Sequence, residues 1–300
     1  MDAARLGEIA ALGTALLWSL SYVQFTVAVR RIGPAALNRL RLLAALIFLM
    51  CAHVAVYGRP VPIDAEPARW GWLILSGVIG FAISDALLFR ALFHLGAHRT
   101  SLLMSLIPLT SALLAWGAFG ERLTWLQMLA GLVTVVGITI VVSSRPAGTR
   151  AIARRAICAG VAFAFGAVVA QSARYILSVQ GMSGGFPPLS ANVLQILAAT
   201  AAVWAVALVR GTAASSFGLL RDRLAGMMTL GGALTGPFLG VTFSLVALSR
   251  APVGVASTLM ALSPVFLLPI SRLAFKEPIT IRAAAGTALA VSGVALLFLF

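Results

Sequence analysis

The sequence predicts an all-α integral membrane protein with ten transmembrane helices, arranged as two inverted five-helix repeats. Composition supports this prediction, because 61% of the residues are hydrophobic, only 10% are charged and the mean hydropathy is +1.03. Soluble domains contain about 45 to 50% apolar and about 25% charged residues. The other two observations behind the prediction are a series of long apolar runs and an internal duplication.

Apolar runs of roughly 20 residues divide the chain, and this is the length that an α-helix needs to cross about 30 Å of hydrocarbon. The first run reaches Arg30 and Arg31 without a small-residue cleavage site, so we interpret it as a spanning helix and not as a signal peptide. Segments with Pro, Gly, Ser and charge separate the runs, and we expect surface loops at 57–69, 144–150 and 210–223. The expected helices lie at residues 7–29, 35–56, 70–94, 100–119, 124–143, 154–178, 189–209, 224–248, 252–275 and 280–299.

The stretch at residues 101–142 recurs 156 residues later, at 257–298. Nearby offsets extend the duplication toward the N-terminus, since Asn38 corresponds to Asn192 and Gln24 to Gln171. Each half therefore holds five helices. Within the long stretch the identical positions, numbered in the first copy, are Ser101, Leu103, Met104, Leu106, Pro108, Ala118, Phe119, Glu121, Thr124 and Gly137.

An odd number of helices makes the second half enter the membrane from the opposite side, so the halves are inverted about an axis in the membrane plane. We expect a first repeat at residues 1–144, a linker at 145–153 and a second repeat at 154–300. Such repeats place a substrate near the bilayer midplane, between the halves. The even total puts both termini on one side. The excess of Lys and Arg after odd-numbered helices predicts that this side is outside.

The charge pattern and the missing motifs narrow the class of function. The net charge is +14, but the basic residues flank apolar runs, so we expect a lipid bilayer and no nucleic acid as a partner. His53, His94 and His98 have no metal-like spacing, and there is no P-loop or G-x-S-x-G motif. The sequence therefore predicts neither an enzyme nor a cofactor or metal site. Any transport has to run downhill or use a gradient.

Three features carry a family resemblance. Trp18 and Ser19 stand together in the first helix, helices four and nine each contain a proline, and residues 119–138 read FGERLTWLQMLAGLVTVVGI. With the ten helices and two repeats, they resemble the EamA branch of the drug/metabolite transporter superfamily over nearly the whole chain. The second copy departs from the motif, with Lys276 in place of the glycine and Pro278 in place of the arginine.

The resemblance implies a multi-pass carrier of the bacterial inner membrane, which in many relatives exports amino acids or other small metabolites. It also implies that both termini are cytoplasmic, against the charge count, so the side stays open. We expect a monomer, with a dimer as the alternative.

Asp85 is the only carboxylate well inside an apolar run, in GFAISDALLFRAL. An ionised side chain in hydrocarbon is costly unless it is paired, protonated or facing water. We expect Asp85 to couple protons or to bind a substrate amine, and the alternative is a structural carboxylate. Arg90 follows five residues later on a different helical face, so it is a poor partner.

Two polar stripes on repeat-equivalent helices are expected to face a central cavity. The stripe on the sixth helix contains Gln171, Arg174, Tyr175 and Ser178. Snorkelling of Arg174 toward the membrane surface is the alternative. The looser stripe on the first helix contains Trp18, Ser21, Tyr22 and Phe25, with Gln24 beside it.

Other candidate residues are apolar. Pro108 and Pro264 lie inside helices four and nine, where a proline kinks a helix. We expect hinges there, unless the kinks only shape the helices. Aromatic and Met side chains are expected to line a pocket for an aromatic or aliphatic group, with plain packing as the alternative: Trp18, Tyr22, Phe81, Phe89, Met104, Phe243 and Met260.

Several polar and small residues are given structural roles. Glu121 and Glu277 are expected to cap the following helices. Arg41, near the start of the second helix, is expected to anchor headgroups or a loop. Cys51 and Cys158 are expected to be small buried side chains. Gly232, Gly236 and Gly240 form a ladder that lets helices pack closely.

Three hypotheses about function follow. The first is a secondary transporter that exports small metabolites by alternating access, most of all amino acids with aromatic or hydrophobic side chains. The second is an uptake or exchange carrier for anionic metabolites such as sugar phosphates, which would depend on Arg174 or Arg90. The third is a membrane scaffold or receptor that transports nothing.

Overall fold

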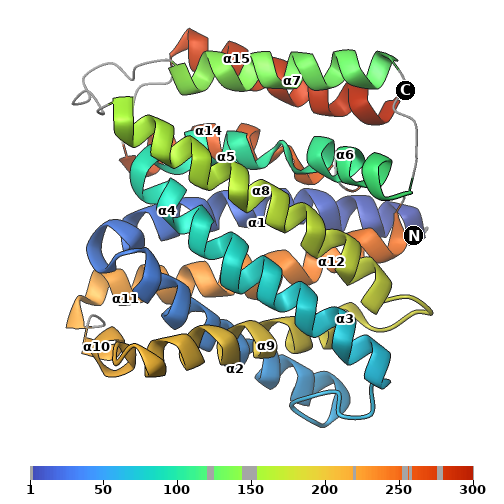
Figure 1. Cartoon of the computed structure of the whole chain (residues 1–300), viewed down its shortest axis with the longest axis vertical. Helices are drawn as coiled ribbons and strands as arrows, with labels where there is room; N and C mark the ends of the chain where they lie inside the picture. Colours follow the sequence, from blue (N-terminus) through green and yellow to red (C-terminus); the bar gives the residue numbers. More distant parts are fainter. Residues whose placement is uncertain are drawn as a thin grey trace.

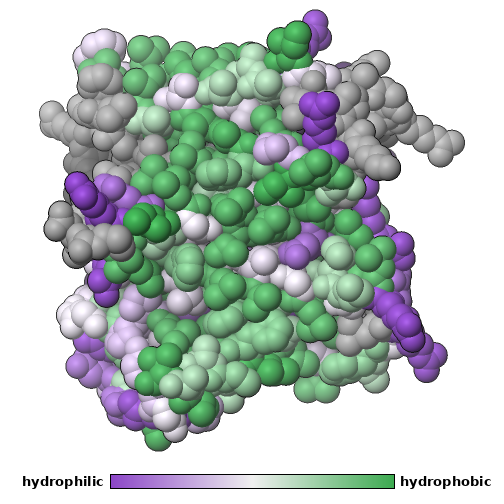
Figure 2. All heavy atoms as spheres, turned by 180° about the vertical axis from the view of Figure 1, so that it is seen from behind, coloured by the Kyte–Doolittle hydropathy of each residue, from purple (hydrophilic) through white to green (hydrophobic). Residues whose placement is uncertain are grey.

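The computed structural model describes residues 3–119, 125–143, 154–218, 221–251, 256, 259–275 and 280–299. In this part of the chain every regular element is a helix, and six helices are long and apolar enough to cross a membrane. Hydrophobic residues cover the middle of the face in Figure 2, while hydrophilic residues gather at the edges where the helices end. This distribution fits a protein whose middle is surrounded by lipid.

The first half folds into the five crossings expected from the sequence. Its elements are α1 (Ala3–Ile32), α2 (Pro34–Tyr57), α3 (Pro67–Gly77), η1 (Val78–Ser84), α4 (Asp85–Leu95), α5 (Ala97–Met104), α6 (Ile107–Phe119) and α7 (Trp125–Ser143). The third crossing runs from α3 through the π-helical turn η1 into α4, and the fourth consists of α5 and α6. Gly58 ends α2 in the left-handed conformation that favours glycine, and its N–H bonds to the Val54 carbonyl at 2.8 Å.

The second half repeats this order. Its elements are α8 (Arg154–Gly181), α9 (Pro188–Val209), α10 (Ala213–Gly218), α11 (Arg223–Ala233), η3 (Leu234–Gly240), α12 (Val241–Arg250), α14 (Ser263–Phe275) and α15 (Ile281–Leu299). The short helix α10 lies within the expected loop at 210–223. The two π-helical turns occur 156 residues apart, at the offset of the sequence duplication.

The halves interlock as an inverted pair. In Figure 1 α1 and α8 run in opposite directions, and the start of α1 lies on the same side of the molecule as the end of α15. Helix α1 packs on α11, η3 and α12, and its equivalent α8 packs on α3, η1 and α4. The equivalents α2 and α9 pack on each other, as do α7 and α15 at the opposite edge. Gly232, Gly236 and Gly240 meet Phe25, Ser21 and Trp18 of α1, which confirms the close packing expected there.

The prolines of the fourth and ninth crossings do not kink a continuous helix. Both crossings are interrupted, at Ser105 and Leu106 in one and at Ala261 and Leu262 in the other. Pro108 and Pro264 then stand in the first turns of α6 and α14. Proline is tolerated in a first turn because the missing N–H would have no partner in the helix anyway.

Two buried asparagines hold the π-helical turns. Asn38 of α2 donates its side-chain amide to the Phe81 carbonyl at 3.3 Å, and Asn192 of α9 donates to the Pro237 carbonyl at 2.9 Å. Asn38 and Asn192 are repeat equivalents, and so are Phe81 and Pro237. A π-turn breaks the regular hydrogen-bond ladder of the helix. Each asparagine therefore satisfies a carbonyl that no bilayer water can reach.

Some expectations are wrong or fall outside the described residues. Cys51 and Cys158 are exposed on the outside of α2 and α8 and not buried. An apolar run does not distinguish a lipid-facing position from an interior one, which explains the error. The linker at 145–153, Glu121, Glu277, Lys276 and Pro278 lie outside the described residues.

Replacing Asn192 by leucine should destabilise the fold by about 1 to 2 kcal/mol, because the Pro237 carbonyl loses its partner in a buried setting. Unfolding in detergent would measure the loss. Thr139→Val is the matched control, since the exposed Thr139 hydroxyl bonds only within its own helix. Equal stability of Asn192→Leu and Thr139→Val would contradict the assigned role.

Asp222 should stabilise the start of α11 in a pH-dependent way. It accepts a hydrogen bond from the Ala225 N–H at 3.1 Å and pairs with Arg31 of α1 at 2.6 Å. These two contacts hold the pKa of Asp222 below its ordinary value. The carboxylate's contribution is complete above the unfolded pKa of about 3.9 and is lost as the pH falls through the folded pKa.

Asp222→Ala should therefore lower the unfolding temperature at pH 7, and the difference from wild type should narrow below about pH 4. Thermal unfolding at both pH values measures this. A difference that stays constant with pH would show that the ionised carboxylate does not matter.

Candidate functional site

A cavity of about 110 Å³ lies between the two halves. Elements of both repeats line it: α1, α2, η1, α4, α5 and the start of α6 from the first half, and α8, η3, α12 and the interrupted ninth crossing from the second. Several of the expected site residues line this cavity: Trp18, Tyr22, Phe81, Asp85, Met104, Gln171, Tyr175, Met260 and Pro264.

The π-helical turn positions Asp85 at the cavity. The Asp85 N–H bonds to the carbonyl of Gly80, five residues earlier, and Asp85 then begins α4. An inserted π-turn shifts the faces of the helix that follows it, and such turns are frequent at functional sites. Asp85 is 8% exposed, so its carboxylate is enclosed by protein.

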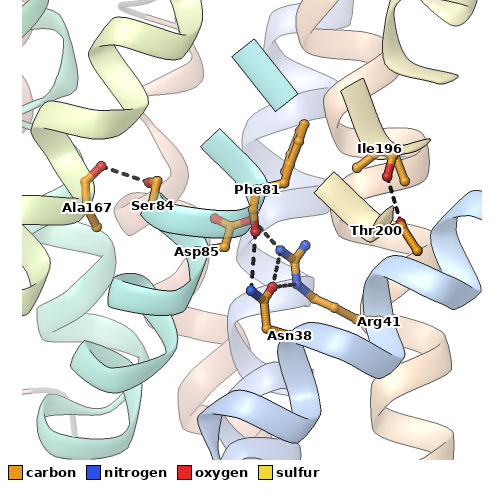
Figure 3. A network of polar contacts seen from close by, with 8 residues as sticks. All are labelled: Asn38, Arg41, Phe81, Ser84, Asp85, Ala167, Ile196 and Thr200. Carbon is orange, nitrogen blue, oxygen red and sulfur yellow. Dashed lines mark hydrogen bonds and ion pairs between the residues drawn. The ribbon is translucent and has the colours of Figure 1, made fainter. Parts of the chain in front are cut away.

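Asp85 forms an ion pair with Arg41 of α2 (Figure 3). Nη2 and Nε of Arg41 also donate to Oδ1 of Asn38, at 2.8 and 3.2 Å. The guanidinium lies 4.8 Å from the centre of the Phe89 ring and 5.8 Å from that of Phe25. Arg41 and Asp85 both face the cavity, and together they are its charged wall.

The expectation that Arg41 anchors headgroups or a loop at the membrane surface is wrong. Only 2% of Arg41 is exposed, because α2 begins at Pro34 and carries the residue two turns into the bundle. Its partner Asp85 is 44 residues away in the sequence, on another helix. Arg90, in contrast, is exposed and stacks over Phe163 at 5.5 Å, away from the cavity. No spacing rule within one helix could have found the pair between Arg41 and Asp85.

Arg174 is completely buried beside the cavity and does not line it. Nη1 donates to Gln195 at 3.1 Å, and the Gln171 amide, oriented with its oxygen toward the guanidinium, accepts from Nη2 at 2.9 Å and from Nε at 3.0 Å. The guanidinium also lies 4.8 Å from the ring centres of both Phe81 and Tyr175. Burial excludes snorkelling, and the contacts make Arg174 a support for two cavity-lining rings.

Close packing fixes Arg174 in this place. A Cβ on Gly80 would lie 1.8 Å from Cδ of Arg174, so only glycine leaves room for the side chain against η1. Gln195, the repeat equivalent of Arg41, contributes its amide to this cluster. The polar role of the position is therefore mirrored in the second half although its charge is not.

Three other expected residues lie outside the cavity. Phe243 is 40% exposed and packs against Gly13 on the outside of the bundle. Gln24 accepts a hydrogen bond from Thr235 at 2.8 Å and packs against Gly231, so it joins α1 to α11 and η3. Pro108 is one residue beyond Ile107, which does line the cavity.

The cavity wall also contains polar groups that were not expected from the sequence. Ser101 and Ser105 lie on α5 and at the break after it. The Ser101 hydroxyl is buried without a hydrogen-bond partner among the described residues, whereas Ser105 bonds the Leu102 carbonyl at 2.6 Å. Serines are too common in membrane helices to have signalled this position.

Comparisons with known proteins agree with this architecture. The sequence model of the EamA-like transporter family matches residues 5–143 and 158–299, one match in each half. A protein of known crystal structure superposes with a TM-score of 0.66 over 97% of this chain and 94% of that chain, at 19% identity, which shows a shared fold.

A curated relative from Streptantibioticus cattleyicolor, described as a probable terminal-alkyne amino-acid exporter, is 29% identical over 129 residues. The match spans 43% of this chain and 42% of that relative. The two family matches together cover nearly the whole chain, with one match in each half. The chain therefore belongs to the EamA-like transporter family, and it is a multi-pass membrane protein.

Proposed function

We propose that this protein is a secondary transporter that exports amino acids across the bacterial inner membrane. The observation that supports this most is the composition of the cavity wall, which combines aromatic and Met side chains with a buried pair of opposite charges. An amino acid with an apolar side chain needs both kinds of surface. The similarity to a probable amino-acid exporter over part of the chain points in the same direction.

Alternating access is the proposed mechanism. The cavity lies where the halves meet, and the fourth and ninth crossings are interrupted beside it at equivalent positions. Chain breaks can absorb changes of backbone angle when one half rocks against the other. We propose that Pro108 and Pro264 set these breaks, and that the halves open the cavity to one side of the membrane at a time.

An anion carrier is the second candidate. Arg41 and Arg174 are both buried near Asp85, and Asp85 interacts electrostatically with each of them, so the positive charges outnumber the negative. However, Arg174 is enclosed by two amides and two rings and does not reach the cavity. The wall itself carries one charge of each sign, which favours a ligand with no net charge.

We propose a monomer as the transporting unit.

Purified protein in liposomes should exchange internal unlabelled amino acids for external radiolabelled leucine or phenylalanine with saturable kinetics. Sugar phosphates should give no exchange. The counterflow assay distinguishes all three hypotheses. Exchange of sugar phosphates alone would support the anion carrier, and no exchange of any solute by folded protein would support the scaffold.

We propose that Asp85 couples protons or binds the amine of the substrate, and both roles require a carboxylate that can ionise. Asp85→Asn should therefore remove the pH dependence of the transport that remains. The groups that face Asp85 are Arg41 of α2, Tyr22 of α1, and Arg174 and Tyr175 of α8. Initial rates between pH 5.5 and 8.5 would measure the effect, using the exposed Arg90→Gln as the matched control. A pH profile of Asp85→Asn that matches wild type would assign Asp85 a purely structural role.

A further inference from the structure

We propose that the ion pair of Arg41 and Asp85 is the part of the cavity that recognises a zwitterion, with Arg41 binding the ligand's carboxylate and Asp85 its ammonium group. This inference rests on the proposed function and specifies the ligand chemistry of the same cavity. It also makes Arg41, which the sequence did not point to, a binding residue.

Both members of the pair keep unused bonding capacity. Arg41 uses Nε and Nη2 for Asn38 and Asp85, and among the described residues its Nη1 makes no hydrogen bond. Asp85 uses Oδ2 for Arg41, and Oδ1 makes no hydrogen bond to any described residue. Because both side chains line the cavity, a donor group and an acceptor group are available there next to each other. A carboxylate beside an ammonium group on one carbon matches this pattern.

Charge balance within the pair that lines the cavity favours the same ligand class, since the further positive charge of Arg174 lies outside the cavity wall. Arg41 and Asp85 neutralise each other when the cavity is empty, and a zwitterion brings one charge of each sign. When a zwitterion binds, Arg41 and Asp85 can each keep an opposite charge beside them, either in the other member of the pair or in the ligand. A ligand with a single charge leaves one buried group without compensation, which is costly in a setting of low dielectric constant. A site built to bind a polar group rejects the analogue that lacks it.

The surroundings hold the pair in place beside apolar residues of the cavity wall. Phe25 and Phe89 pack at 5.2 Å from each other in an edge-to-face arrangement and flank the Arg41 guanidinium. Asn38 fixes the guanidinium from the other side and is itself bonded to η1. Met104 and Met260 lie elsewhere on the cavity wall, where the ligand's apolar side chain would bind.

The first test compares three probes in the wild-type protein. Leucine carries both charges, 3-methylbutylamine lacks the carboxylate and 4-methylpentanoate lacks the ammonium group. Each competes with radiolabelled leucine in the liposome counterflow assay. Leucine should compete at least about tenfold better than either analogue. If either analogue competes within about threefold of leucine, the inference is wrong.

The second test changes the pair itself. Removing one partner of a buried pair destabilises a fold, so the charge-neutral double variant Arg41→Gln with Asp85→Asn is the main test, with folding checked by thermal unfolding. Its discrimination between leucine and the two analogues should fall below about threefold. The matched control neutralises the exposed pair, Arg31→Gln with Asp222→Asn, and should keep the wild-type discrimination. Full discrimination in the folded double variant of the buried pair would overturn the assignment.

The two proposals fail in different ways. If the protein exchanges amino acids but accepts the single-charge analogues equally well, amino-acid transport stands and only zwitterion recognition falls. If no amino acid is exchanged while a sugar phosphate is, the proposed function falls and the zwitterion site falls with it.

Discussion

The absence of water from the bilayer core is the constraint on which the rest of this structure depends. Each backbone polar group between the membrane surfaces needs a partner inside the protein, and buried polar side chains are costly without one. The bundle meets this requirement with bonds between helices, such as that from Ser19 to the Ser263 carbonyl and that from Ser84 to the Ala167 carbonyl, both at 2.8 Å. The asparagine contacts to the π-helical turns and the ion pair at the cavity follow the same rule. Polar residues therefore connect the two halves.

The duplication explains the backbone features that the two halves share. The positions at which the two copies differ in sequence explain the charged pair at the site. Both halves contain a π-helical turn held by an asparagine, and in both the fourth crossing is interrupted. The two halves therefore share these irregularities of the backbone. Their charges differ. The repeat equivalents of Arg41 and Asp85 are Gln195 and Val241, and neither is ionisable. The pair of opposite charges on the cavity wall thus comes from the first half alone.

The candidate site was predictable only in part, for reasons that particular residues show. Asp85 stood out because a lone carboxylate in an apolar run is costly, and Gln171 and Tyr175 because they share a helical face. Arg41 was misjudged because its partner is on another helix, and Phe243 because lipid and protein interior select the same apolar side chains. Arg174 was expected to face the cavity, but it is buried beside it and packs against the rings of Phe81 and Tyr175, which do line the cavity.

The sequence by itself determined the fold class, the ten crossings and the inverted relation of the halves. These properties depend on the length of each apolar run and on an odd number of helices per repeat. Both quantities can be counted directly along the sequence. Tertiary structure alone decided which polar residues meet, because contacts such as that of Arg41 with Asp85 depend on how helices distant in the sequence rotate and cross. It also decided that the third and eighth crossings contain π-helical turns, since the freed carbonyls are stable only where Asn38 and Asn192 can reach them.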